Sequence, residues 1–210
     1  MLRFYRGQPL KRGRLGILPA TFNPVTRAHL ALVDAAEAQH QLGQAVFLLP
    51  TEFPHKPYTG ASFEDRIAML DGAVGSRPRR AIAASEEGLF FRIARDFREV
   101  CGPAVELFLL CGRDAAERIV GWDYGGGPPF ARQLEEFQML VASRQGALRI
   151  PAEYAERIHA VDLPGSLDQV SASLVRQAIR EGGRWEHLVP EAVARRIREQ
   201  RLYQRRDPEE

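Results

Sequence analysis

Residues 16–32, GILPATFNPVTRAHLAL, give the clearest structural pattern in the chain. A short apolar run breaks at Pro19, the turn-rich Thr21-Phe22-Asn23-Pro24 follows, and a helical pattern then begins. A strand, a tight loop and a helix in that order form the first half of a βαβ unit. Such a helix begins with unpaired backbone N–H groups and a partial positive charge. The segment therefore predicts a phosphate site at the start of this helix.

Thr26 and His29 are the residues of this segment that predict chemistry. They lie three positions apart, so on a helix they share one face near its first turn. A hydroxyl and an imidazole at an anion-binding helix end are suited to stabilising charge on a phosphate. The alternative is a His29 that faces the core and is satisfied by a backbone carbonyl.

The rest of the chain alternates between apolar strand patterns and amphipathic helix patterns. We expect strands at 45–49, 80–84, 105–111, 137–142 and 157–161, and helices at 63–71, 89–100, 113–120, 171–180 and 190–201. This alternation predicts an α/β fold with a doubly wound, predominantly parallel sheet and right-handed crossovers. We expect one domain over 14–204, preceded by a basic, mobile or loosely docked extension over 1–13 and followed by a solvated tail over 205–210.

Composition excludes several functional classes. The 210 residues carry a net charge of only +2, with basic residues spread along the chain, which argues against nucleic-acid binding. Cys101 and Cys111 have no metal-ligand spacing, and two cysteines fit a reducing, cytoplasmic setting. No apolar run approaches the roughly 20 residues that span a bilayer, so we expect no membrane segment.

The motif around His29 resembles that of a known superfamily. Thr21-Phe22-x-Pro24-x-Thr26-x-x-His29 is similar to the signature of nucleotidyltransferases that carry a (His/Thr)-x-Gly-His motif. That family usually has glycines where this chain has Pro19-Ala20, and glycine at the position of Ala28. Proline cannot donate a backbone hydrogen bond, and alanine does not take strained glycine conformations as freely.

Further stretches resemble the nicotinate mononucleotide adenylyltransferases of that superfamily. These are Pro54-His55-Lys56 with Arg66-x-x-Met69-Leu70, Gly112-x-Asp114 with Trp122, the segment 170–176 (VSASLVR), and the closing segment 187–193 with Leu202-Tyr203. The resemblance covers nearly the whole chain after residue 14. One departure concerns the acceptor pocket, because the family's Ser-Tyr-Thr stretch is replaced here by residues 87–92, EGLFFR.

The resemblance implies a Rossmann-like nucleotidyltransferase fold and a reaction of NAD biosynthesis. ATP would transfer its adenylyl group to nicotinate mononucleotide, giving deamido-NAD and pyrophosphate. Mg²⁺ would be bound mainly through ATP phosphates, without a protein metal site. The implied catalytic residues are His29, Thr26 and Arg176; the ATP-binding residues are Thr21, Phe22, Asn23, Gly112, Asp114, Ser171 and Ser173; the acceptor-side residues are Lys56, Trp122 and Arg144.

Simpler roles remain open for several of these residues. Ser171 could only cap a helix, Asp114 could cap another, Trp122 could cover an apolar edge, and Lys56 and Arg144 could be solvated loop charges. Two rival functions also remain open. One is a related transferase whose acceptor is phosphopantetheine or a sugar or polyol phosphate, and the other is a non-catalytic nucleotide-binding homologue. The pattern leaves the oligomeric state open.

Overall fold

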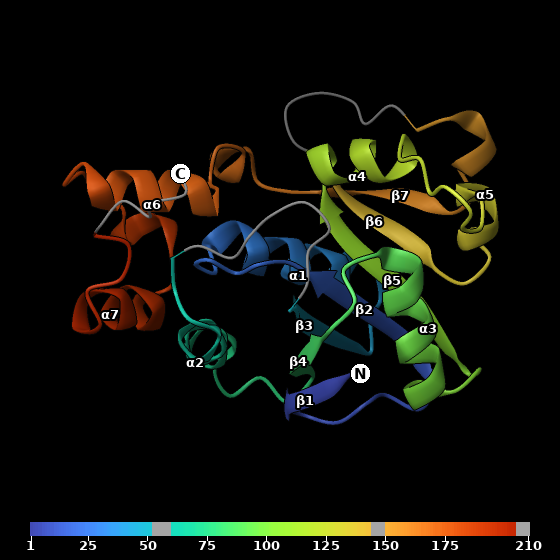
Figure 1. The fold of residues 1–210 in the computed structure, drawn as a ribbon, viewed down its shortest axis with the longest axis horizontal. Coiled ribbons are helices and arrows are strands. Elements are labelled where there is room, and N and C mark those ends of the chain that lie inside the picture. Colours follow the sequence, from blue (N-terminus) through green and yellow to red (C-terminus); the bar gives the residue numbers. More distant parts are fainter. Residues whose placement is uncertain (52–59, 144–149, 205–210) are drawn as a thin grey trace.

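A seven-stranded, mostly parallel sheet forms the centre of the computed structural model, which describes residues 1–51, 60–143 and 150–204 (Figure 1). Its strand order is β1-β4-β3-β2-β5-β6-β7, and only β1 runs antiparallel to its neighbour. The strands are β1 (Arg3–Arg6), β2 (Gly13–Pro19), β3 (Gln44–Pro50), β4 (Arg80–Ser85), β5 (Val105–Gly112), β6 (Gln138–Ser143) and β7 (Ile158–Asp162). The predicted α/β class is confirmed.

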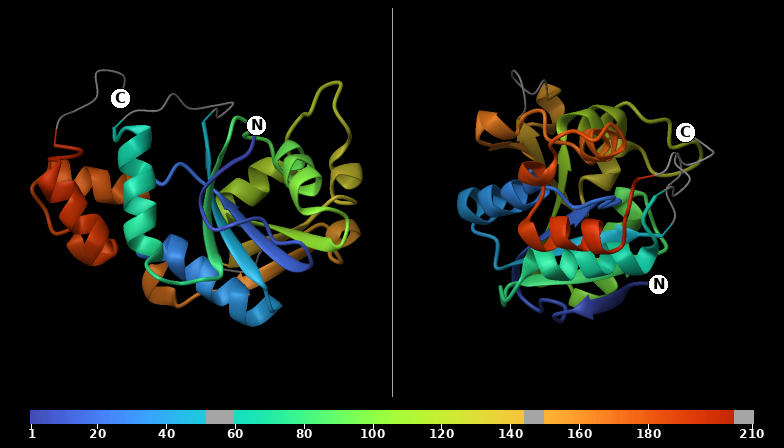
Figure 2. Two further views of the ribbon diagram at one scale, coloured as in Figure 1. Left: turned by 90° about the horizontal axis from the view of Figure 1, so that it is seen from below. Right: turned by 90° about the vertical axis from the view of Figure 1, so that its left-hand side faces the viewer.

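Helices cover both faces of this sheet (Figure 2). On one face lie α1 (Arg27–His40) and α2 (Phe63–Val74), and α6 (Ala172–Arg180) and α7 (Glu191–Glu199) extend the same apolar core, with α7 packed against α2. On the other face lie α3 (Phe90–Cys101), α4 (Arg113–Val120) and the short α5 (Phe130–Gln133). Single 3-10 turns occur at Ala152–Tyr154, Gly165–Leu167 and Glu186–Leu188. Within the described ranges, no helix is long and apolar enough to cross a membrane.

The apolar runs of the sequence form central strands because both faces of the sheet are covered. In β3, Phe47 and Leu49 face the core under α1 and α2, whereas Val46 and Leu48 face the core under α3. This alternation follows the two-residue period of a strand. A continuous apolar run therefore fills two separate cores.

The strand order places a topological switch point between β2 and β5. From β2 the chain crosses through α1 to β3 on one side, while β5 pairs with β2 on the other side. In open α/β sheets, ligands bind in the crevice at the carboxyl ends of such strands. The loops that follow β2 and β5 are therefore where a site is expected.

The N-terminal residues differ from the expectation. Arg3–Arg6 form β1, with Arg3 opposite Ala84 and Phe4 opposite Ala83 at the edge of the sheet. Phe4 also packs edge-on against Phe97 of α3, with ring centroids 6.2 Å apart. A loosely docked extension is thus wrong for these four residues, whose pairing was hidden by the shortness and charge of the segment. The predicted tail, 205–210, lies outside the described residues.

The other predicted elements are present with boundaries shifted by a few residues. In α6, Leu174 is 38% exposed while Val175 is fully buried. The start of α6 at Ala172 puts Val175 and Ile179, four residues apart, on its inner face.

Candidate active site

Thr26 and His29 form a compact pair at the start of α1. Thr26 is the fully buried N-cap residue, and its Oγ1 lies 2.8 Å from Nδ1 of His29. The backbone N–H of Thr26 donates to the same Nδ1 over 3.0 Å. A nitrogen that accepts from an N–H carries no proton, so the proton of a neutral ring lies on Nε2. Nδ1 of His29 therefore accepts a hydrogen bond instead of donating one to a backbone carbonyl.

Phe22 supports the imidazole from within the core. Its ring is fully buried and meets the His29 ring edge-on, with centroids 5.2 Å apart. The Phe22 ring also packs against the ring of Phe47 of β3, with centroids 5.8 Å apart. The backbone of Phe22 has φ of 46°, in the left-handed region, which turns the chain between β2 and α1. His29 is therefore held both at one ring nitrogen and along its ring.

Asn23 joins this loop to two distant parts of the chain. Its side-chain Oδ1 accepts a hydrogen bond from the backbone N–H of Ala61 over 3.2 Å. Its backbone carbonyl accepts one from Nη1 of Arg176, 153 positions later, over 2.8 Å. The structure thus brings the loop after β2 and the helix α6 together.

Ser171 caps α6, as the simpler of its two predicted roles requires. Its Oγ accepts a hydrogen bond from the backbone N–H of Leu174 over 3.1 Å. Both Ser171 and Ser173 are exposed. Capping uses the hydroxyl of Ser171 as an acceptor, so its proton remains able to donate to another group.

Gly112 and Asp114 lie at the exit of β5. With Asp168 they line a cavity of about 480 Å³. Asp168 precedes Ser171 by three residues, so this cavity lies between the exit of β5 and the segment that leads into α6. A Cβ added to Gly112 would meet no atom within 4 Å, so packing within the described chain does not demand glycine there. Asp114 is an exposed acid in the first turn of α4, where Gly112 is the N-cap.

Trp122 is not among the described residues that line this cavity. It follows α4, whose eight residues span about 12 Å, and its side chain is 42% exposed. Two residues later, the ring of Tyr124 meets Phe91 of α3 at 6.4 Å. Phe91 also lines a second cavity, of about 460 Å³, together with Glu87, Arg92, Arg95, Asp96, Glu99, Gly127 and Pro128. Through Tyr124, the segment that follows Trp122 packs against α3.

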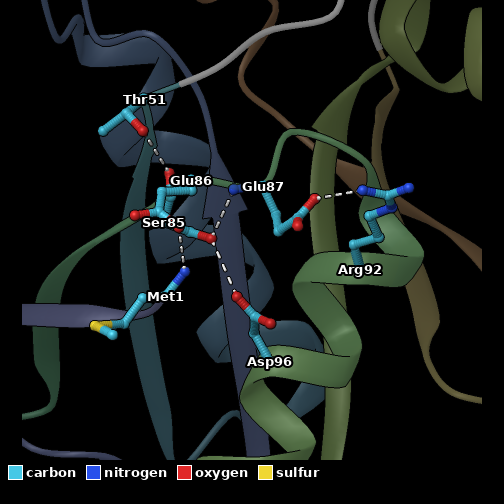
Figure 3. Close-up of polar contacts among 7 residues, drawn as sticks. All are labelled: Met1, Thr51, Ser85, Glu86, Glu87, Arg92 and Asp96. Carbon is cyan, nitrogen blue, oxygen red and sulfur yellow. Dashed lines mark hydrogen bonds and ion pairs between the residues drawn. The ribbon is translucent and has the colours of Figure 1, made fainter.

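The segment that replaces the Ser-Tyr-Thr stretch is held by polar contacts at the exit of β4 (Figure 3). Oγ of Ser85 accepts from the backbone N–H of Glu87 over 3.0 Å and donates to Asp96 over 3.3 Å. The Glu87 carboxylate pairs with Arg92 at 3.4 Å. Because α3 connects β4 to β5, it crosses over β3 and β2. It lies on the face of the sheet opposite α1.

The candidates Lys56 and Arg144 lie outside the described residues. Sequence reasoning also missed the burial of Arg66. Arg66 is only 4% exposed, and its Nε and Nη1 donate to the carbonyl oxygens of Ser62 and Thr21 over 3.3 and 3.5 Å. The available signal was its spacing, because Arg66 shares a helix face with Met69 and Leu70. A charge on an apolar face indicates a buried group with a specific polar role.

Comparisons with known proteins identify the family of this chain. Residues 17–178 match the model of the cytidylyltransferase-like family. A Synechococcus protein named "Probable nicotinate-nucleotide adenylyltransferase" is 33% identical over 90% of this chain and 94% of its own length. A protein of the same name from Gloeobacter violaceus is 32% identical over 90% of this chain and 96% of its own length.

Solved structures share the fold. Nicotinic acid mononucleotide adenylyltransferase from Plasmodium falciparum, complexed with NaAD, superposes with a TM-score of 0.72 at 15% identity. The match covers 91% of this chain and 98% of that one. The family model and the two relatives above cover most of the chain, including the β2–α1 loop, the β5 exit and α6. The chain therefore belongs to the cytidylyltransferase-like nucleotidyltransferases and, within them, to the nicotinate-nucleotide adenylyltransferase family.

Proposed function

We propose that this enzyme transfers the adenylyl group of ATP to nicotinate mononucleotide in NAD biosynthesis. An oxygen of the acceptor's 5′-phosphate attacks the α-phosphorus of ATP. The bond from that phosphorus to the bridging oxygen breaks, and pyrophosphate leaves with its electron pair. The products are deamido-NAD and pyrophosphate. The observation that carries the proposal is the Thr26–His29 pair at the start of α1, joined to Arg176 through Asn23.

These residues act mainly by stabilising the negative charge of the triphosphate. The Nε2–H of His29 donates to a phosphate oxygen because Thr26 occupies Nδ1. Backbone amides of residues 21–23, the hydroxyls of Ser171 and Ser173, and the guanidinium of Arg176 hold the remaining phosphate oxygens. Such preorganised donors stabilise charge that develops during transfer, and little covalent help is needed.

The two substrates occupy different places on the enzyme. The nucleoside part of ATP lies in the cavity of about 480 Å³ beside Gly112 and Asp114, where open space at the glycine admits a ligand. The pyridine ring of the acceptor lies on the opposite side of the switch point, near Trp122 and the first turn of α3. The half-exposed Trp122 supports this arrangement, since it leaves ring surface on which a pyridine can stack.

We propose that Mg²⁺ accompanies ATP, bound mainly by phosphate oxygens and water. The donors around the loop after β2 are hydroxyls, amides, an imidazole and a guanidinium, which suit phosphate rather than the metal. Mg²⁺ supplies neutralisation of the phosphate charge. Nicotinate mononucleotide and ATP are the proposed partners, with neither nucleic acid nor membrane.

A reducing, cytoplasmic setting is also proposed, supported by the state of the two thiols. Cys101 and Cys111 are both free and buried. Burial raises the pKa of Cys111 to about 12, so it remains a thiol.

The experiment supplies the purified protein with ATP, Mg²⁺ and one acceptor at a time. Nicotinate mononucleotide, phosphopantetheine and glycerol phosphate form the panel, and both pyrophosphate and the joined nucleotide are measured. We expect turnover on the order of 1–10³ s⁻¹ with nicotinate mononucleotide. Turnover with another acceptor alone would assign the related transferase. Binding of ATP without turnover on any acceptor would assign the non-catalytic homologue.

A further inference from the structure

We propose that Arg66 is a positioning residue that orients the phosphate-binding loop after β2. This inference rests on the proposed function and adds to it a residue with no direct contact to substrate. Arg66 comes from the first turn of α2, beneath the loop that connects β2 to α1. The role follows from what its guanidinium binds.

The guanidinium of Arg66 donates hydrogen bonds to two backbone carbonyls from different segments. Nε donates to the Ser62 carbonyl over 3.3 Å, within α2's own first turn, and Nη1 donates to the Thr21 carbonyl over 3.5 Å. The side chain is almost wholly removed from solvent. In such surroundings a hydrogen bond to a charged donor is stronger than in water, and a buried cation is held where its acceptors lie.

Because of the geometry of one peptide unit, the hydrogen bond from Arg66 to the Thr21 carbonyl also orients the next backbone N–H. The Thr21 carbonyl and the Phe22 N–H belong to the same planar trans unit, so they point in opposite directions. A guanidinium that holds the oxygen on the α2 side therefore aims the N–H at the other side. The same loop is fixed at its exit by Arg176, which binds the Asn23 carbonyl over 2.8 Å. Two arginines from separate helices thus each bind a backbone carbonyl of one phosphate-binding loop.

Tyr203 closes this region from the carboxyl-terminal end. It is 8% exposed, and burial raises the pKa of its phenol while the charges of Arg176 and Arg66 act against that rise. Its ring and the Asn23 amide both lie about 3.1 Å from where a Cβ at Gly60 would stand. Arg66 therefore works in a packed, water-poor setting, where a small displacement of the loop is not absorbed by solvent.

The test measures the affinity of a non-hydrolysable ATP analogue with Mg²⁺, by calorimetry, without any acceptor. Arg66→Met keeps the volume and removes the donors. We expect it to weaken analogue binding at least about tenfold, since a misaimed amide forfeits a hydrogen bond to a charged phosphate. Arg66→Lys keeps the buried charge, but its ammonium lacks the planar fork that reaches both carbonyls. We expect it to bind at an intermediate strength.

Arg196→Met is the matched control. Arg196 of α7 binds Asp65, the residue before Arg66, through Nε and Nη2 at 3.1 and 2.8 Å. Its loss loosens the same turn of α2, where α2 and α7 lie side by side (Figures 1 and 2). We expect a lower Tm with analogue affinity within about threefold of wild type.

Three results would overturn the proposal. They are wild-type affinity in a folded Arg66→Met variant, an equal loss of affinity in Arg196→Met, and failure of both Arg66 variants to fold, which would make Arg66 a core residue only. If Arg66→Met alone fails to fold, wild-type affinity in Arg66→Lys refutes the role. A wrong acceptor assignment leaves this assay unaffected, whereas a wild type that binds no ATP refutes the proposed function first.

Discussion

Replacing His29 with alanine is the most direct test of the chemistry. The imidazole is fixed by two contacts at Nδ1 and by the Phe22 ring, so its Nε2–H is a donor oriented before substrate arrives. Losing one preorganised donor to a transition-state oxygen typically lowers kcat by about 10²–10³, or about 2.7–4 kcal/mol. We expect His29→Ala to fall in that range while its Tm stays near that of wild type.

Thr26→Val measures how much of this effect depends on orientation. The substitution removes the Oγ1 hydrogen bond to Nδ1 but leaves the backbone N–H bond in place. One neutral hydrogen bond contributes about 0.5–1.5 kcal/mol, so kcat should fall about 2- to 12-fold. In the His29→Ala background the same change should have almost no effect on kcat, because no imidazole remains to be oriented.

The assay is steady-state pyrophosphate release at saturating ATP, Mg²⁺ and nicotinate mononucleotide, with thermal unfolding as the folding control. Wild-type kcat in a folded His29→Ala variant would refute the catalytic role. Full additivity of the two substitutions would instead refute the orientation of His29 by Thr26.

Three further predictions concern other regions. Arg176→Ala should weaken ATP binding far more than acceptor binding in calorimetry, and unchanged ATP affinity would leave it as a helix residue that only ties α6 to Asn23. Pro19→Gly and Ala20→Gly should keep or improve kcat/KM for ATP, because neither residue has positive φ and Ala20 N–H already pairs with Leu48; loss of activity would show that the loop needs them. Burial lowers the pKa of His159, so stability should fall as pH drops below about 6.5. His159→Gln should lessen that fall in stability, measured by urea unfolding between pH 7 and pH 5. An unchanged profile would show that His159 is not the group responsible.

The main elements of the fold were predictable because each has a periodicity that burial enforces. The run 45–49 could only be a strand covered on both faces, and in the structure its side chains alternate between two cores. β1 could not be predicted, since four residues with two arginines carry almost no periodic signal. Its position is set by the exposed edge of β4, which local sequence does not reveal.

The candidate site was predictable to the extent that topology alone gathers its residues. Parallel strands end at one edge, so the loops after β2 and β5 had to lie near one another. Arg66 was not predictable as a loop-holding residue, because its partner is a backbone carbonyl 45 positions away. A buried cation on an apolar face marks a polar role, but only coordinates identify its acceptor.

The choice of acceptor depends on one substituent of the pyridine ring. Nicotinate mononucleotide carries a carboxylate where nicotinamide mononucleotide carries a neutral amide. A pocket built from donors pairs with the carboxylate, whereas the amide's NH₂ leaves donors facing donors, which is costly when buried. Mismatches of this kind can discriminate strongly because they leave polar groups unpaired. The second cavity contains Arg92 and Arg95, but Glu87, Asp96 and Glu99 lie with them, and Glu87 already pairs with Arg92.

The preference should therefore be real but moderate. We expect kcat/KM to favour nicotinate mononucleotide by at least about tenfold, equal to about 1.4 kcal/mol. Trp122→Ala should lower kcat/KM for both acceptors by similar factors, since stacking does not distinguish the two rings, and Trp122→Phe should restore part of the loss. Equal use of the two wild-type substrates would remove the argument from ring charge. A Trp122→Ala variant that uses both acceptors as wild type does would place the ring elsewhere, because an exposed tryptophan with no substrate contact can be truncated at little cost.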